Sequence, residues 1–153
     1  NPALVAGEEP ELCLRLRATG WRIWRLDEEM TLHDAAMHRI GQWWKRTRRA
    51  GYAFAEGAAL HGTAPEFHWV AETRRALLWG LGLPVMGLLG MFVSPWLALV
   101  FLVYPVQVLR LWRHLGLERA LFLTLGKLPE AMGVVQFWLN RLLRRRAALI
   151  EYK

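Results

Sequence analysis

The sequence has very little cysteine, and Cys13 is its single thiol. The chain therefore has no internal disulfide and no cysteine cluster that could bind a metal ion. A reducing compartment is compatible with this composition. Residues 1–7 have neither a basic stretch nor a long apolar run, so they do not resemble a signal peptide. We expect the chain to begin inside a larger protein.

Charge is absent from 34 consecutive residues, Ala76–Leu109. A single helix of that length would extend about 51 Å, well beyond a hydrocarbon core of about 30 Å. The segment Val93-Ser94-Pro95 interrupts the run near its middle, which predicts two arms of about 25 Å each. Pro84 and Pro105 are expected to kink the arms, as membrane helices tolerate.

Arginines flank this uncharged run on both sides. Arg74 and Arg75 precede it, and Arg110 and Arg113 follow it. Under the positive-inside rule, both ends lie in the cytoplasm and the number of crossings is even. A transmembrane helical hairpin is therefore the favoured interpretation. A re-entrant or interfacial helix pair and a soluble core remain the alternatives.

The net charge of +7 is unevenly distributed. Residues 1–34 carry a net −3, whereas residues 35–75 carry +4 and residues 76–153 carry +6. The chain also has nine tryptophans. Basic residues with tryptophan are typical of nucleic-acid binding or of a membrane interface. The long apolar run favours membrane lipid as the partner, and we expect no nucleic-acid partner.

The C-terminal segment has apolar residues at helical spacing, and Pro129 suits the start of a second helix there. Basic residues gather at its end. The amphipathic pattern predicts a helix in the lipid headgroup layer, with a helix packed on a cytosolic domain as the alternative. The apolar face and the basic end comprise Val134, Val135, Phe137, Trp138, Leu142, Arg141, Arg144, Arg145 and Arg146.

The first 60 residues predict two helices separated by a strand. The helices cover Glu9–Thr19, closed by Gly20, and about 35–60, and the alternation in residues 21–26 is typical of a strand. Glu11 and Arg15 are spaced to form an ion pair on the first helix. His61 and His68 are expected in a surface connection.

Four polar residues of the second predicted helix fall within an arc about 100° wide. Guanidinium and ammonium groups in such an arc suit a diphosphate. A solvated basic face, or a face attracted to anionic lipid, is the alternative. The four residues are Gln42, Lys45, Arg46 and Arg49.

The stretch GEEPELCLRLRATGW, followed by TLHD, resembles the C-terminal part of family 2 glycosyltransferases. The typical sequence motif of that family is G-E-D-x-D-L-x-x-R-L-x-x-x-G-W. The resemblance covers about residues 3–57, and the apolar run with its basic tail is similar to membrane-attached members. It implies an inverting transferase that uses a nucleotide sugar with Mg²⁺ or Mn²⁺ on the diphosphate.

The resemblance also implies roles for individual residues. Glu9, with Glu8 beside it, corresponds to the acid that deprotonates the acceptor hydroxyl, whereas helix capping is the alternative explanation for these acids. The family's Q-x-x-R-W motif, which contacts the donor diphosphate, corresponds to Gln42-Trp43-Trp44-Lys45-Arg46. This degenerate match argues against processive polymer synthesis. His33 resembles a histidine that helps to hold the metal.

The fold class implied by these features is mainly α. A helix and strand from a GT-A α/β domain would be followed by a transmembrane or re-entrant hairpin and by amphipathic helices. The predicted segments are 1–70 for the end of the catalytic domain, 71–113 for the hairpin and 114–153 for the basic interfacial tail. No D-x-D motif occurs in the chain, so the nucleotide-binding half should precede residue 1.

The predicted function is therefore that of a C-terminal fragment, inactive alone. The intact enzyme would transfer sugar to a lipid-linked or surface-glycan acceptor in cell-envelope polysaccharide biosynthesis, at the cytoplasmic membrane with its catalytic part facing the cytoplasm. The alternative is a non-catalytic membrane anchor or partner subunit.

Overall fold

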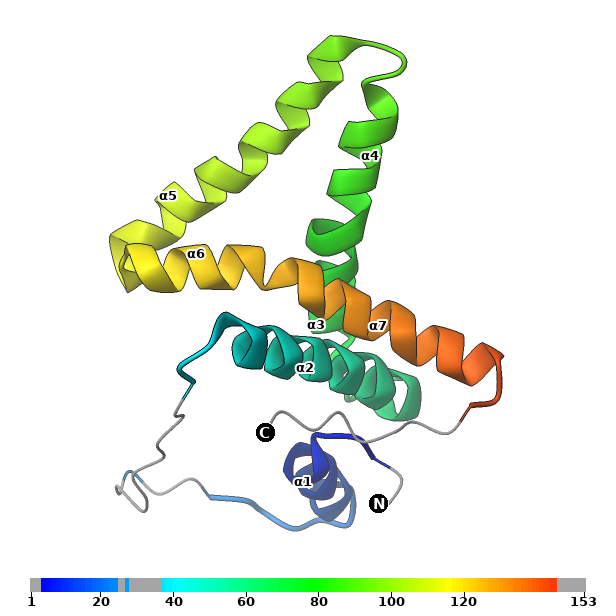
Figure 1. Ribbon diagram of the computed structural model, residues 1–153. Coiled ribbons are helices and arrows are strands. Elements are labelled where there is room, and N and C mark those ends of the chain that lie inside the picture. The colour runs from blue at the N-terminus through cyan, green and yellow to red at the C-terminus, as the bar shows by residue number, and fades with distance from the viewer. Residues whose placement is uncertain (1–3, 25–26, 28–36, 146–153) are drawn as a thin grey trace.

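The computed structural model describes residues 4–24, 27 and 37–145 (Figure 1). Within these residues the regular structure is helical, and we use "hairpin" for Val70–Leu115 and "platform" for α2, α6 and α7. The elements are α1 (Glu8–Ala18), α2 (Ile40–His61), α3 (Val70–Leu77), a π-helical turn η1 (Leu78–Gly82), α4 (Leu83–Gly90), a 3₁₀ segment η2 (Pro95–Leu102), α5 (Val103–Leu115), α6 (Leu117–Leu125) and α7 (Lys127–Leu142).

The expected strand at residues 21–26 is wrong for the part that the structure describes, Trp21–Trp24, and so is the assignment of an α/β remnant. The described residues form no strand anywhere, so these four have no partner for a hydrogen-bonded ladder. The chain leaves α1 instead through a helix-ending turn. Gly20 has φ 88°, its N–H bonds to the carbonyl of Arg17, and the Trp21 N–H bonds to the carbonyl of Leu16.

The uncharged run forms a helical hairpin that projects from the rest of the molecule (Figure 1). One arm consists of α3, η1 and α4, and the other of η2 and α5. The arms meet at a turn at residues 91–94, close to the predicted interruption. The second arm, Pro95–Leu115, is 21 residues long, so it extends beyond Leu109 and spans about 36 Å.

The two prolines expected to kink the hairpin arms lie near turns that are not α-helical. Pro84 is the second residue of α4, which follows η1, and Pro105 is the third residue of α5, which follows η2. Because proline has no N–H, it removes one helical hydrogen bond, which wider or tighter turns can accommodate. The two arms are joined across the hairpin by the Tyr104 hydroxyl, which donates to the Trp79 carbonyl at 2.5 Å.

The platform is held together by very close helix packing. A Cβ atom added to Gly51 would come within 2.0 Å of the Glu130 carbonyl oxygen, and one added to Gly133 within 2.0 Å of the Arg48 carbonyl oxygen. The backbones of α2 and α7 therefore touch, as they do at small-residue contacts in membrane helix pairs. At the base of the hairpin, Gly80 makes the same kind of contact with Lys127.

The core lies where these helices meet. Its large members pack edge to face, with the ring centroids of Tyr52 and Phe137 5.3 Å apart. The buried cluster comprises Val5, Tyr52, Ala55, Ala76, Val134 and Phe137. It joins α2 from predicted segment 1–70 to α3 from segment 71–113 and to α7 from segment 114–153. The segment boundaries themselves stay a prediction.

Candidate functional site

The two acids expected to carry the chemistry, Glu8 and Glu9, lie exposed in the first turn of α1. Gly7 directly precedes them with φ 88°, a conformation that favours glycine. A Cβ atom at Gly7 would also lie only 2.5 Å from the ring of Trp69. The chain therefore needs glycine here for two independent reasons, and the turn presents both carboxylates to solvent.

Side chains of α2 hold the segment that leads to these acids. The Val5 N–H donates to Glu56 Oε2 at 3.1 Å. The Val5 carbonyl accepts from Arg49 Nε at 3.1 Å and from Arg49 Nη2 at 2.7 Å. Val5 itself is buried. Both polar groups of one peptide residue are thus fixed by a single helix, which sets the position from which α1 starts.

Glu56 is a residue that sequence reasoning missed. Burial raises its pKa, the hydrogen bond from the Val5 N–H opposes that rise, and the negative charge of Glu8 adds to it. The carboxylates of Glu8 and Glu56 therefore interact electrostatically across the α1–α2 contact. The available signal was that Glu56 is the single acid in the sequence of α2.

The third acid of the opening cluster, Glu11, is buried and structural. Arg15 Nε donates to its carboxylate at 2.9 and 3.1 Å, and His61 Nε2 lies 3.3 Å from it. Burial acts to raise the pKa of Glu11, but the hydrogen bonds from Arg15 and His61 and the charge of Arg15 outweigh it, so the pKa lies below its usual value. The predicted Glu11–Arg15 pair is confirmed.

The predicted diphosphate arc lies on one helix, but its members have different surroundings. Gln42 Oε1 accepts from the backbone N–H groups of His38 and Arg39 at 3.1 Å each, so it caps the start of α2. Arg49 bonds to Val5, about 10 Å further along the helix axis. Lys45 and Arg46 are exposed. Binding of a diphosphate by these residues stays a prediction.

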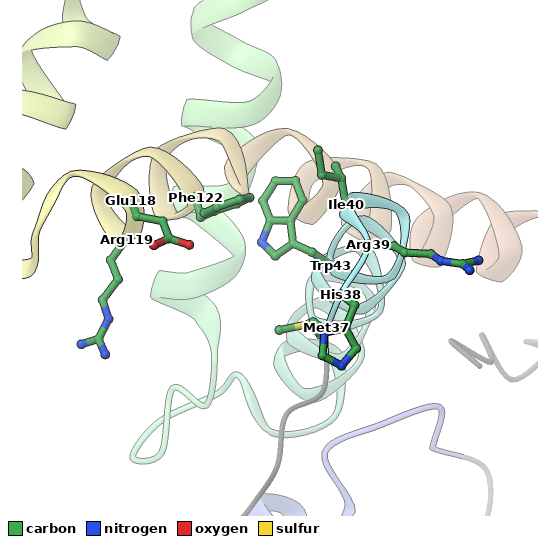
Figure 2. Close-up of a pocket in the computed structure, with 8 residues that line it drawn as sticks. All are labelled: Met37, His38, Arg39, Ile40, Trp43, Glu118, Arg119 and Phe122. Atoms are coloured by element: carbon green, nitrogen blue, oxygen red, sulfur yellow. The ribbon is translucent and has the colours of Figure 1, made fainter.

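A cavity of about 460 Å³ lies beside the capped start of α2 (Figure 2). Trp43 points toward Phe122 of α6, with ring centroids 5.1 Å apart, and these rings form the contact between the two helices. Arg39 and Arg119 extend away from one another. The lining is completed by Met37, His38, Ile40 and Glu118, so this cavity contains neither Glu8 nor Glu9.

The described residues do not make a metal site by themselves. No group of three or more His, Cys, Asp or Glu side chains gathers within the ranges 4–24 and 37–145. His33, the predicted metal ligand, lies outside the described residues. The expectation of Mg²⁺ or Mn²⁺ therefore stays a prediction from the resemblance.

Comparison with known proteins adds no assignment. The chain matches no protein-family model, no curated protein and no solved structure.

Proposed function

We propose that this chain is the membrane-attached C-terminal part of an inverting glycosyltransferase. The intact enzyme takes a nucleotide sugar and transfers the sugar to a lipid-linked or surface-glycan acceptor. The proposal rests on the sequence motif around Glu8 and Glu9 together with the shape of the molecule, in which a hairpin with a long uncharged run projects from the platform that supports α1 (Figure 1).

The observation that carries the proposal is the exposure of the hairpin. Pro95–Leu115 is long and apolar enough to cross a membrane, and no residue of its apolar stretch is buried inside the molecule. Phe92 is 89% exposed and Val93 85% exposed at the tip. A water-soluble protein rarely leaves such a large continuous apolar surface uncovered, whereas lipid covers it without cost.

The charges favour insertion from the cytoplasmic side. The four flanking arginines lie at the platform end of the hairpin, and the tip at residues 91–94 carries no charge. Under the positive-inside rule the platform then lies at the cytoplasmic face. Helix α1 lies on the side of α2 that faces away from the hairpin, so Glu8 and Glu9 face the aqueous phase (Figure 1).

In the proposed reaction, Glu9 accepts the proton of the acceptor hydroxyl. The hydroxyl oxygen forms a bond to the anomeric carbon of the donor sugar, and the bond from that carbon to the diphosphate breaks on the opposite face. The Val5 peptide, bonded to Glu56 and Arg49, positions the start of the helix that carries the base. A general base must lie within hydrogen-bond reach of its proton. Gln42, Lys45, Arg46 and Arg49 are the predicted contacts to the donor diphosphate. The rest of the donor site and the metal ligands come from outside the described residues.

The test uses membranes that contain a longer protein, in which the polypeptide encoded upstream precedes this chain. We expect transfer of labelled sugar from a nucleotide sugar, and a loss of about 10²-fold or more for Glu9→Gln. Glu66→Gln, which removes an exposed carboxylate far along the chain, is the control and should retain turnover. The chain alone should give no transfer.

The alternative is a non-catalytic membrane anchor, and the bonding of Glu11 within the chain favours it because one acid of the cluster is fully explained by stability. Membrane association with unchanged turnover in Glu9→Gln, or with no turnover in any extended chain, would support the anchor and contradict the enzyme. Turnover by the 153 residues alone would contradict the fragment assignment.

A further inference from the structure

A second cavity, of about 430 Å³, lies between the base of the hairpin and α7. Its size is within the range of small-molecule sites. Gly80 and Leu81 of the first arm form one wall, and α7 forms the other. Because the Gly80 and Lys127 backbones are in contact, the two walls are fixed relative to each other. The groove is therefore part of the folded structure.

The α7 wall is an apolar stripe that α7 does not use for packing on α2. Leu128, Met132, Val135 and Leu139 recur at the spacing of one helix face. Of these, Leu128, Met132 and Leu139 are exposed. Together with Leu81, which is also exposed, the stripe continues the apolar surface of the hairpin down to the platform.

The polar part of the same groove is cationic. Arg48 and Arg145 line it, and among the described residues that line it there is no aspartate or glutamate. Arg48 Nε donates to Gln136 Oε1 at 3.0 Å, which fixes the plane of the guanidinium. The cavity at the start of α2 differs, because Glu118 accompanies its arginines. An amphiphile with a negative head group matches the groove at the hairpin base.

We propose that this groove binds one anionic phospholipid molecule. Its acyl chain lies on the Leu81 and α7 wall, and its phosphate is bound by Arg48 and Arg145. The inference rests on the proposed membrane attachment but assigns a lipid with a structural role, distinct from the sugar acceptor. Arginine suits this ligand because its planar donors match phosphate oxygens, and a cationic group near the headgroup layer attracts anionic lipid.

The experiment places the chain in nanodiscs of mixed phosphatidylcholine and phosphatidylglycerol and measures, by native mass spectrometry after detergent extraction, which lipid stays bound. We expect one phosphatidylglycerol to be retained in preference to phosphatidylcholine. Arg48→Gln with Arg145→Gln should lower that preference by about 30-fold. Arg113→Gln with Arg119→Gln removes the same charge from exposed positions and should leave the preference unchanged.

A second variant tests the apolar wall with all charges intact. Val135→Trp fills the groove and should also abolish retention, so the test does not depend on the arginine variant folding. Added inorganic phosphate should not displace the lipid; displacement would indicate a simple phosphate site and overturn the proposal.

Two further results overturn the proposal. Equal retention of the two lipids, or an equal loss in the Arg113/Arg119 control, would show that only bulk charge acts. Either result leaves the proposed function intact. Failure of the chain to enter nanodiscs at all would contradict both this inference and the membrane attachment.

Discussion

The platform and the hairpin are both rich in apolar residues, but they use them in opposite ways. At the α2–α7 contact the buried residues include Gly51 and Gly133, and the backbones touch. In the hairpin the large side chains Leu88, Leu102 and Val106 are all more than half exposed. Small residues therefore make the closest helix contact in the platform, whereas these large apolar side chains of the hairpin remain exposed.

The same contrast appears in the polar groups. Two partly buried arginines of α2 bond to partners distant in sequence, Arg48 to Gln136 and Arg49 to Val5. Among the described residues, one side-chain hydrogen bond joins the two hairpin arms, from Tyr104 to the carbonyl of Trp79. The arms are therefore held together mainly by apolar contacts.

The largest effect is expected from charges placed in the hairpin. Val85→Arg with Leu102→Arg puts one arginine on each arm, and at about 2.5–3.5 kcal/mol each the pair should cost about 5–7 kcal/mol of insertion free energy. The measurement is the fraction of chain in the membrane pellet after carbonate extraction. The control Leu60→Arg changes an exposed leucine of α2 and should leave that fraction unchanged.

The depth of the hairpin can be measured in the same system. In a Cys13→Ser background, Val93→Cys places a thiol at the exposed tip. Labelling from the far side of the membrane indicates a full crossing. Labelling from the platform side alone indicates a re-entrant pair, and protection from both sides indicates a tip that stays within the bilayer.

The next largest effect is expected at the contact between α2 and α7. Gly51→Leu forces a side chain into the space occupied by the Glu130 backbone and should lower the free energy of unfolding by at least about 3 kcal/mol. Thermal unfolding in detergent measures it. Gly41→Ala is the matched control, because an added Cβ there meets nothing within 4 Å. If both variants unfold alike, the close contact does not stabilise the platform.

The smallest effect concerns the ion pair beneath the platform. Arg15 and His61 keep the pKa of Glu11 below its usual value. The charged carboxylate therefore stabilises the fold at every pH above the usual pKa of a glutamate. This stability, about 1–3 kcal/mol, is lost as the pH falls through the lowered pKa. Glu11→Gln should show the loss at neutral pH and a flatter acid profile in denaturant titrations.

Glu72→Gln breaks an exposed pair with Arg75 and provides the comparison. It should cost well under about 1 kcal/mol, because solvent screens that pair. Equal losses of unfolding free energy in the two variants would mean that the burial of Glu11 does not strengthen its pair with Arg15.

Local patterns predicted the local structure well. The spacing around Glu11 and Arg15 predicted their pair, and Gly20 predicted the end of α1. The hairpin turn followed from Val93-Ser94-Pro95, and the predicted helix at about 35–60 agrees with α2, apart from its first residues. These features depend on interactions between residues that are close in the sequence, so a single sequence was sufficient to predict them.

Contacts between distant segments could not be predicted. His61 was expected in a surface connection, but it lies at the end of α2 against Glu11. The sequence presented Arg49 as one of three equivalent cations beside Gln42, but the structure bonds it to Val5, 44 residues away. The expected strand was wrong for its described residues, 21–24, because alternation alone cannot supply a neighbouring strand. Roles of Glu9, Lys45 and Arg46 in catalysis or binding stay predictions.

The bonds from Arg49 and Glu56 to Val5 fix where α1 begins. They tie the segment before α1 to α2, and α2 rests directly on α7. Helix α1, whose first turn carries Glu8 and Glu9, therefore lies across α2 from the projecting arms of the hairpin (Figure 1). In the proposed enzyme, this separation predicts an acceptor whose reacting hydroxyl is carried on an extended saccharide chain, away from the lipid anchor.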